Sequence, residues 1–388
     1  MDVAILGGGV AGLATAISLR RLGMTVDVFE RRESVHGLGA GIVCWPNASF
    51  VLSELGILDE LRSLAGTTTA MRRISIDGTE LGRLDIRLID EAMGYPSLPV
   101  LRKDLMQVLL RRTEELGVSI HYNANAVGIA SDSDGRRVQF SNGLTISPAI
   151  VIGADGRMNS IARRYVAKVN RPVFQGFVNW IGIYHSDVAL FDHAEIGDYW
   201  GLGARFGIVP ISAHTAYWAA GIAVLSSEAR EVGEDIVRLR QAFDGWPSPI
   251  GDIILNTTES NIKRVVLYDH NPMPTWHKDN VLLVGDAAHA ALPTSGQGAA
   301  QALEDAWCLA HEFATSHGSP DDIMAAFTQR RLAKTTGIIM GGRAFASMLF
   351  NKDPAECKAR DRDAMQADYA TMAIRMATGW SAGLPLGL

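Results

Sequence analysis

VAILGGGVAGLATAISLRRLGMTVDVFE, residues 3–30, contains the pattern that decides the fold. Its first apolar run, residues 3–6, predicts a buried strand, and the glycines after it supply a tight turn. The residues that follow have helical spacing over about residues 11–21, and a second strand is expected to end at Glu30. A strand, a glycine turn, a helix and a second strand in this order predict a Rossmann-like α/β domain.

The glycines of this stretch indicate what the domain binds. Gly7, Gly9 and Gly12 form a GxGxxG pattern directly after a strand and at the start of a helix, the context in which the pattern is informative. The first glycine permits the turn, the second lets a pyrophosphate approach the backbone, and the third lets helix and strand pack closely. Glu30 follows at about the distance, roughly 20 residues, at which an acid accepts a hydrogen bond from a ribose 2′-hydroxyl. We therefore expect an ADP-containing dinucleotide, FAD or NAD, and the acid disfavours the 2′-phosphate of NADP.

Length and composition exclude several classes of protein. The chain has 388 residues, of which 47% are hydrophobic, so it can bury a large core in two or three domain-sized units. Its net charge is -6, and its basic residues are scattered rather than clustered. Nucleic-acid binding is therefore disfavoured.

Cysteine usage and apolar runs indicate the compartment. Cys44, Cys308 and Cys357 show no CxxC or Cys/His ligand spacing, so we expect neither a disulfide framework nor a metal site. The uncharged run over residues 3–19 lacks the basic segment of a signal peptide, since Asp2 stands there, and the glycines would break its apolar part. No other uncharged stretch approaches the ~20 residues of a spanning helix. A soluble cytoplasmic protein without membrane partners is expected.

Two further motifs place polar turns at the ends of strands. In ISPAIVIGADGRMNSIARR, residues 146–164, a strand that ends near Gly153 leads into Asp155 and Gly156. In VLLVGDAAHAALPTSGQGAAQALEDA, residues 281–306, a strand leads to Asp286.

The loop after Asp286 is the second glycine-rich turn of the chain. Pro293 fixes its course, and Gly296, Gln297 and Gly298 begin a long helix. An acid at the end of a strand can hold a ribitol hydroxyl, and a helix N-terminus directs free N–H groups and partial positive charge at an anion. FAD supplies both a ribitol and a ring that becomes anionic on reduction, whereas NAD supplies neither. The two glycine turns are therefore expected to hold opposite ends of one FAD.

The three motifs, in this order over residues 2 to about 330, resemble the FAD-dependent aromatic hydroxylases of the para-hydroxybenzoate hydroxylase class. The resemblance implies a monooxygenase that consumes NAD(P)H and O2 and hydroxylates a small aromatic or heteroaromatic ring through a flavin C4a-hydroperoxide. It also implies that Asp155 and Gly156 serve both FAD and the nicotinamide cofactor. GLGAGIVCWPNA, residues 37–48, is similar to the family segment beside the flavin.

Further cofactor contacts follow from the same resemblance. Arg102 in VLRKDL is similar to an arginine that contacts FAD in the family, and Arg31 and Ala299 complete the expected cofactor set. The serine and arginine that follow the DG motif in the family correspond to Ser160 and Arg163, each one residue later than the family pattern.

The absence of a second GxGxxG over residues 100–280 predicts that NAD(P)H visits the flavin without a nucleotide fold of its own. The expected organisation is a discontinuous FAD-binding domain, residues 1–170 and 271–330, with an inserted antiparallel-sheet substrate domain over residues 171–270. Residues 331–388 are expected to form helices that cover the FAD domain or make a homodimer contact.

Three short runs in the middle segment, FVNWIGIYH, GARFGIVPI and TAYWAAGIAV, read as antiparallel strands. Strand alternation places Arg205 on a face shared with glycines, and Tyr217 on a face shared with Ala219 and Gly221. The glycines expected beside Arg205 are Gly201, Gly203 and Gly207. A nearly bare face with a few polar groups is typical of a cavity floor, although both side chains could instead face solvent.

These runs also resemble bacterial FAD-dependent urate hydroxylases. In that family an arginine and a tyrosine at the places of Arg205 and Tyr217 contact the purine. We therefore expect these two residues to orient the substrate, and Pro293 to lie beside the reacting face of the flavin.

Other conspicuous residues have two interpretations each. Asn179 and Trp180 could line the pocket or belong to the sheet. His289 is expected to be a packing residue, because no partner acid is evident nearby, and Cys44 to be a small buried hydrophobe.

Three other functions are alternatives to aromatic hydroxylation. A flavin halogenase would show a WxWxIP stretch, which this chain lacks. A dehydrogenase without oxygen insertion, using flavin or nicotinamide, and a non-catalytic protein on the same fold are the remaining alternatives.

Overall fold

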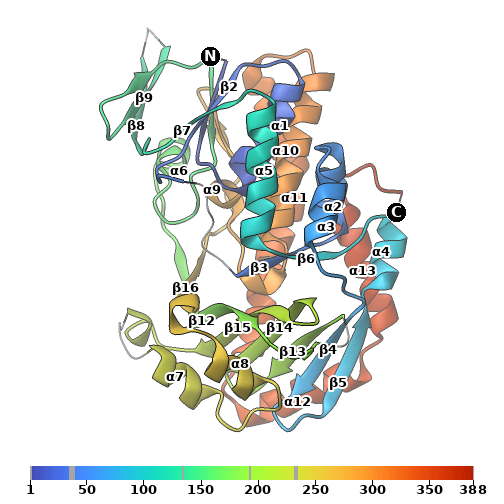
Figure 1. The fold of residues 1–388 in the computed structure, drawn as a ribbon. Coiled ribbons are helices and arrows are strands. Elements are labelled where there is room, and N and C mark those ends of the chain that lie inside the picture. The colour runs from blue at the N-terminus through green and yellow to red at the C-terminus, as the bar shows by residue number, and fades with distance from the viewer. Residues whose placement is uncertain (1, 35–39, 133–134, 192–193, 231–234, 388) are drawn as a thin grey trace.

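Two sheets organise the chain in the computed structural model, a six-stranded sheet and a seven-stranded sheet linked by long helices (Figure 1). The structure describes residues 2–34, 40–132, 135–191, 194–230 and 235–387. The mixed α/β class expected from the sequence, with a Rossmann-like core and C-terminal helices, is confirmed.

The six-stranded sheet is parallel except at one edge. Its order is β17 (His277–Lys278), β18 (Val281–Leu283), β11 (Ile150–Gly153), β1 (Val3–Leu6), β2 (Val26–Phe29) and β7 (Ser119–His121), and only β17 runs antiparallel to its neighbour. These strands are short and mostly apolar, as expected of a sheet covered on both faces.

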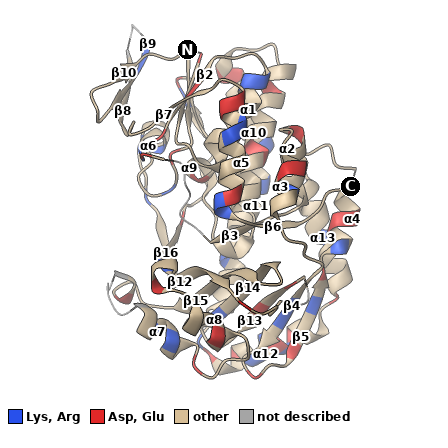
Figure 2. Ribbon diagram, viewed as in Figure 1, with Lys and Arg blue, Asp and Glu red and all other residues tan. Residues whose placement is uncertain are grey.

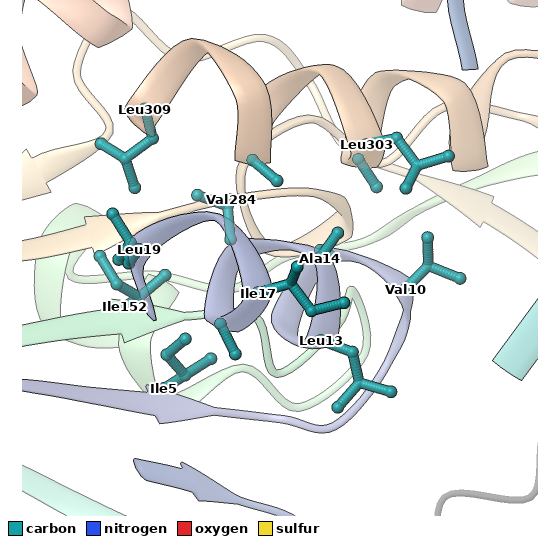
Figure 3. Close-up of a cluster of buried hydrophobic side chains, with 14 of the residues drawn as sticks. Ile5, Val10, Leu13, Ala14, Ile17, Leu19, Ile152, Val284, Leu303 and Leu309 are labelled. Atoms are coloured by element: carbon teal, nitrogen blue, oxygen red, sulfur yellow. The ribbon is translucent and has the colours of Figure 1, made fainter. Parts of the chain in front are cut away.

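Helices cover one face of this sheet. They are α1 (Val10–Arg21), α5 (Arg102–Glu115) and α10 (Gly298–Thr315), with the 30-residue α11 (Pro320–Leu349) packed behind α10. Figure 3 shows this core: Ile5 and Ile152 of the strands, Leu13, Ile17 and Leu19 of α1, and Leu303 and Leu309 of α10 gather in one cluster. The first motif and the last are therefore packed into one core.

The opposite side of the sheet carries α6 (Ile161–Ala167) and a small three-stranded sheet. The strands of the small sheet are β8 (Ala126–Asp132), β9 (Gly135–Phe140) and β10 (Thr145–Ile146). Near the C-terminal ends of the main strands lie β3 (Gly41–Cys44), paired with β6 (Leu98–Leu101), and α2 (Pro46–Glu54), followed by α3 (Leu58–Leu64).

The seven-stranded sheet contains the three runs of the middle segment. Its order is β16 (Lys263–Asp269), β12 (Val173–His185), β15 (Thr215–Ala223), β14 (Ala204–Ser212), β13 (Glu195–Trp200), β4 (Ala70–Ser75) and β5 (Glu80–Asp85). Neighbours are antiparallel except β13 and β4. The antiparallel pairing expected for β12, β14 and β15 is observed, while β4 and β5 join the sheet from residues 70–85, within the first predicted segment.

One face of this sheet is a separate hydrophobic core. Trp180, Phe206 and Trp218 are buried there against the helices α7 (Asp235–Ala242) and α8 (Ile250–Asn256). The other face is turned toward the first sheet and the C-terminal helices (Figure 1).

The C-terminal helices contact both parts of the molecule. α11 begins at the Ser319 capping box, packs on α10, and ends near the seven-stranded sheet. α12 (Pro354–Gln366) contacts β5, and α13 (Tyr369–Ser381) packs on β5 and on α4 (Arg87–Met93). Whether this segment also supports a dimer stays a prediction.

Acidic and basic residues are interspersed along the described part of the chain. In the ribbon coloured by residue type, both kinds occur on the helices and on the seven-stranded sheet (Figure 2). No helix among the described residues is both long and apolar enough to cross a bilayer.

Candidate functional site

The three sequence motifs meet at one edge of the six-stranded sheet. They follow β1, β11 and β18, which are parallel neighbours, so their C-terminal ends lie side by side. A Cβ placed on Gly285 would lie 2.7 Å from the Cβ of Ala11, so the turn before Asp286 rests on α1. The two glycine-rich turns, far apart in sequence, therefore lie together.

The glycines of the first turn have two different surroundings. Gly7 adopts a φ of +110°, and a Cβ there would lie 2.3 Å from the carbonyl oxygen of Ala154. A Cβ on Gly12 would lie 1.9 Å from the carbonyl oxygen of Gly7. Gly9 differs, because nothing lies within 4 Å of its Cβ position. Gly7 and Gly12 thus allow close packing, while Gly9 borders open space.

Glu30 stands where β2 ends, opposite the glycine turn. Its carboxylate is 8% exposed and accepts hydrogen bonds from the backbone N–H groups of Gly8, at 2.8 Å, and Arg32, at 3.0 Å. The exposed Arg31 follows it and lines a surface cavity of about 620 Å³. The lining includes Arg32, Asn125, Asn159 and Arg164, so this cavity is rich in cationic and amide donors.

Asp286 lies at the start of α9 (Asp286–His289) and is paired with Arg157. The Arg157 guanidinium donates to Asp286 Oδ2 from Nη2 at 2.7 Å and from Nε at 3.0 Å. Desolvation alone would raise the pKa of Asp286, but the charge and hydrogen bonds of Arg157 outweigh it and hold the pKa below its usual value. Arg157 directly follows the DG pair, but no sequence motif indicated its contact with Asp286.

Arg102 approaches the same edge from the first position of α5. Burial lowers the pKa of its guanidinium, an effect that the charge of Asp286 partly offsets. Its Nε is buried and has no hydrogen-bond partner among the described residues. Such a donor needs an acceptor, since an unpaired buried polar group is costly.

Asp155 is placed beside the first turn, but its carboxylate serves α6. It accepts hydrogen bonds from the Ser160 hydroxyl at 2.5 Å and from the backbone N–H of Ile161 at 2.6 Å. Burial raises its pKa more than these bonds lower it. A direct contact of Asp155 and Gly156 with a cofactor stays a prediction.

The two residues displaced from the family pattern have structural roles. Ser160 caps α6 by accepting the N–H of Arg163 at 2.8 Å. The Arg163 side chain donates to the carbonyl oxygens of Ala287 and Ala288, at 2.8 and 3.0 Å, so it ties the second motif to α9.

The loop of the third motif ends at an open helix N-terminus. Gly296 has a φ of +64°, and its carbonyl oxygen accepts a hydrogen bond from Trp45 Nε1 at 3.0 Å. Pro293, Gly296 and Gly298 are exposed, and Ala299 is half-buried. α10 has no side-chain cap, and nothing lies within 4 Å of the Cβ position of Gly298. Its first N–H groups are therefore available to an anion.

These features fit FAD. The open space at Gly9 and Gly298, the unpartnered Nε of Arg102 and the uncapped α10 lie around adjacent strand ends. Glu30 lies beside the first turn and Asp286 beside the second, so each turn has a carboxylate acceptor next to it, as the ribose and the ribitol of FAD would require. Of the predicted flavin-side segment, residues 37–39 lie outside the described residues, and the remainder forms β3 and the start of α2.

The expectation that His289 lacks a partner acid is wrong. His289 Nε2 lies 2.6 Å from Asp305 Oδ2, and the same oxygen accepts the N–H of Gly285 at 2.7 Å. The sequence offers no local signal for this contact, because Asp305 belongs to α10 and reaches α9 through helix packing.

Arg205 and Tyr217 lie on the same face of the seven-stranded sheet. Their strands pair Arg205 with Gly221 and Val209 with Tyr217, and residues paired across a sheet point to the same side. Gly201 and Gly203 precede β14, so only Gly207 of the three predicted glycines shares that face within the strand. Arg205 keeps 22% of its side chain exposed and donates from Nε to Asp198 Oδ1 at 2.5 Å, so it does not point freely into solvent.

Tyr217 connects this face to β3 and to Trp45, next to the loop that enters α10. A Cβ on Gly41 of β3 would lie 2.0 Å from its ring, so the ring rests directly on the β3 backbone. Tyr217 and Trp380 both pack in one small cluster with Trp45, the residue that holds Gly296. The face of the seven-stranded sheet that carries Arg205, Tyr217 and Asn179, named the polar face from here on, is thus directed at the loop that enters α10.

Alternation along β12 separates Asn179 from Trp180. Asn179 is paired with Gly221, lies on the polar face and is 8% exposed, and its Oδ1 has no partner among the described residues. Trp180 points into the core beneath α7 and α8. Cys44 is buried, and burial raises the pKa of its thiol to about 12, which agrees with a packing role.

Comparison with known proteins gives four findings: a family model, two relatives and one solved structure. The model of the FAD binding domain family matches residues 1–340. An FAD-dependent urate hydroxylase of Mycolicibacterium vanbaalenii is 30% identical, with 100% of this chain and 98% of that protein covered. A 3-amino-4-hydroxybenzoate 2-monooxygenase of Streptomyces cremeus is also 30% identical, with 99% and 96% covered. The crystal structure of Klebsiella pneumoniae HpxO complexed with FAD and uric acid superposes with a TM-score of 0.90 at 24% identity, covering 100% of this chain and 98% of that one, which shows a shared fold.

Proposed function

The chain belongs to the FAD binding domain family and is an FAD-dependent monooxygenase, and from this premise we propose that its substrate is a small heteroaromatic ring of the urate type held between Arg205 and Tyr217. The family and the cofactor agree with the expectation from the motifs. One observation carries the substrate proposal: Arg205 and Tyr217 share the sheet face that is turned toward Gly296. The relatives' urate and aminohydroxybenzoate are both small planar rings with polar edges.

Residues of the first glycine turn would bind the ADP half of FAD, and residues of the second turn would bind the flavin half. Gly9 leaves room for the pyrophosphate, and Glu30 accepts from the ribose of the ADP half. Asp286 would hold the ribitol, and the first turn of α10 would face the ring. Arg102 supplies its unpartnered Nε to an oxygen of the cofactor. Bound FAD supplies the capacity to take electrons from NAD(P)H and to activate dioxygen for insertion of one oxygen atom into the ring.

The substrate would lie between the sheet face and the exposed Pro293. Arg205 binds the acceptor edge of the ring through the groups that Asp198 leaves available. Burial raises the pKa of Tyr217, so its hydroxyl keeps its proton near neutral pH and donates a hydrogen bond to the substrate. Asn179 offers its amide on the same face. The aromatic rings of Tyr217 and Trp45 exclude water from the reacting region.

The proposal is tested with FAD-loaded protein and a panel containing urate and 3-amino-4-hydroxybenzoate. NADH and NADPH are supplied in turn, and NAD(P)H consumption, O2 uptake, H2O2 release and product mass are measured. We expect a urate-like ring to accelerate NAD(P)H consumption and to gain one oxygen atom. NAD(P)H oxidation without oxygen incorporation for any ring would contradict the proposal and favour a dehydrogenase.

Two variants test the roles in substrate binding proposed for Arg205 and Tyr217. Arg205→Ala is expected to raise KM by about 10- to 100-fold, or to divert the reaction to H2O2, because an ionic hydrogen bond contributes roughly 1.5–3 kcal/mol. Tyr217→Phe should weaken substrate binding with FAD retained. Arg83→Ala is the matched control, since this exposed arginine pairs with Glu195 on the same sheet. Wild-type KM and coupling in Arg205→Ala would remove Arg205 from the site.

A further inference from the structure

Asp198 is a buried carboxylate in the middle of the polar sheet face. It is 1% exposed, and its Oδ1 accepts a hydrogen bond from Arg205 Nε at 2.5 Å. A carboxylate removed from water in this way must be paired, or its desolvation strongly destabilises the fold. The sheet therefore contains an ion pair next to the surface on which the substrate is proposed to lie.

The strand register explains why the guanidinium can reach this carboxylate. Asp198 of β13 is paired with Gly207 of β14, two residues beyond Arg205 on the same face. A Cβ on Gly207 would lie 3.7 Å from Arg205 Nη2, so the guanidinium passes over the bare glycine to meet Asp198. The gap in side chains predicted at Gly207 is filled by the arginine itself.

The other arginine beside Asp198 is engaged elsewhere. Arg73 of β4 is the register partner of Asp198 on its other side. Its guanidinium lies 5.1 Å from the ring centroids of both Trp200 and Tyr369. Arg205 is therefore the cation whose bond to Asp198 orients a side chain on this face.

The bond to Nε determines which edge of the guanidinium remains available. A guanidinium carries donors on Nε and on two terminal nitrogens, all in one plane. With Nε bound to Asp198, the terminal Nη1 and Nη2 form a fork of two parallel donors. Neither terminal nitrogen is among the buried donors that lack a partner, which agrees with a fork that faces the open side of the pair.

We propose that Asp198 is a positioning residue that holds Arg205 by Nε, so that Nη1 and Nη2 together select rings with two adjacent acceptor atoms. A carbonyl beside a deprotonated ring nitrogen, or a ring carboxylate, presents such an edge to a planar fork. This inference rests on the proposed contact of Arg205 with the substrate. Asp198 itself does not touch the ring.

The first test is Asp198→Asn, which preserves size and an acceptor oxygen but removes the charge. We expect KM for the best substrate to rise about 10- to 100-fold and coupling to fall, while kcat at saturation changes less. FAD content and the thermal midpoint serve as checks on folding. Glu195→Gln is the matched control, because Glu195 lies on the same strand, pairs with exposed Arg83 and points to the opposite face.

A double-variant cycle separates positioning from general stability. If Asp198 acts through Arg205, Asp198→Asn should add almost nothing to KM in an Arg205→Ala background. Full additivity would overturn the proposal, as would wild-type KM and coupling in Asp198→Asn when Arg205→Ala is impaired. Wild-type behaviour of Arg205→Ala would instead refute the proposed function.

A second measurement does not depend on whether the variant folds. Wild-type protein is titrated with pairs of substrate analogues that differ only in one of two adjacent acceptors, such as a ring carbonyl replaced by hydrogen. We expect the Kd to increase at least about tenfold when one acceptor is lost. Equal binding of both analogues would overturn the inferred fork.

Discussion

Trp45 and Gly296 are joined by a hydrogen bond of 3.0 Å from the indole Nε1 to the glycine carbonyl oxygen. Trp45 precedes α2, and Gly296 lies in the loop that enters α10. The Trp45 ring lies 5.0 Å from that of Trp380, at the end of α13. The C-terminal helices are thereby connected to the backbone that is proposed to face the flavin ring.

Trp45→Phe should loosen the loop at Gly296, because it keeps an aromatic ring but removes the N–H donor. We expect weaker FAD binding and a shifted flavin absorbance spectrum, with a loss of about 1 kcal/mol in binding free energy. FAD titration of the apoprotein measures this. Trp276→Phe is the control, because it deletes a similar indole bond, to Met273 at 3.1 Å, within the core. Equal FAD affinity of the two variants would contradict the prediction.

Gly9→Ala and Gly12→Ala should fail in different ways. The Cβ position of Gly9 is open, so the apoprotein should fold with unchanged stability and lose FAD affinity, since the methyl group occupies the path of the pyrophosphate. Gly12→Ala places a methyl group 1.9 Å from the Gly7 carbonyl oxygen, so the apoprotein itself should be destabilised. Apoprotein melting and FAD titration distinguish the two effects. Tight FAD binding by Gly9→Ala would place the pyrophosphate elsewhere.

Arg331 should be a major determinant of stability. It is 2% exposed and bonded to Glu304 and Asp305, both fully buried. Burial alone would lower its pKa, but these two carboxylates raise it above the usual value. Arg331→Met removes the guanidinium that bridges the two buried carboxylates, so Glu304 keeps only Lys334 and Asp305 keeps only His289 as side-chain partners with a possible positive charge. This should cost about 3–5 kcal/mol of unfolding free energy.

The neighbouring Arg330 provides the control for that measurement. It pairs with Glu312 at 2.6 Å and keeps 33% of its side chain exposed. Arg330→Met should therefore cost no more than about 1 kcal/mol. Urea unfolding of both variants gives the comparison, and similar losses would show that the buried network does not contribute as inferred.

The lowered pKa of Asp305 predicts how the unfolding free energy depends on pH. Burial acts to raise its pKa, but the charges of His289 and Arg331 and its hydrogen bonds outweigh burial and lower the pKa. A carboxyl whose folded pKa lies below the unfolded value of about 3.9 stabilises the fold above that pH and loses this contribution as the pH falls further. Unfolding free energies measured from about pH 2 to pH 6 should therefore fall more steeply below about pH 4 in the wild type than in Asp305→Asn. Parallel curves would contradict this assignment.

The sequence predicted best where structure is determined locally. The motif over residues 3–30 requires only a strand, a turn and the helix that follows, so the structure places Gly7, Gly9 and Glu30 as expected. Alternation within β14 and β15 likewise put Arg205 and Tyr217 on faces with small neighbours.

Partners brought together by packing were not predictable in this way. Asp305 reaches His289 only because α10 lies against α9, and Asp198 meets Arg205 only through strand register. Asp286 is paired with Arg157, which belongs to another strand end. No periodicity along the chain encodes such contacts, because they depend on how elements are arranged in three dimensions.

The recruitment of β4 and β5 from residues 70–85 bears on how the protein can be divided for experiments. An excised segment of residues 171–270 would leave one side of β13 without its parallel neighbour, with a row of free backbone donors and acceptors. Exposed edges of this kind favour self-association. Isolated production of the middle segment would therefore be expected to yield aggregates, and studies of ligand recognition require the intact polypeptide.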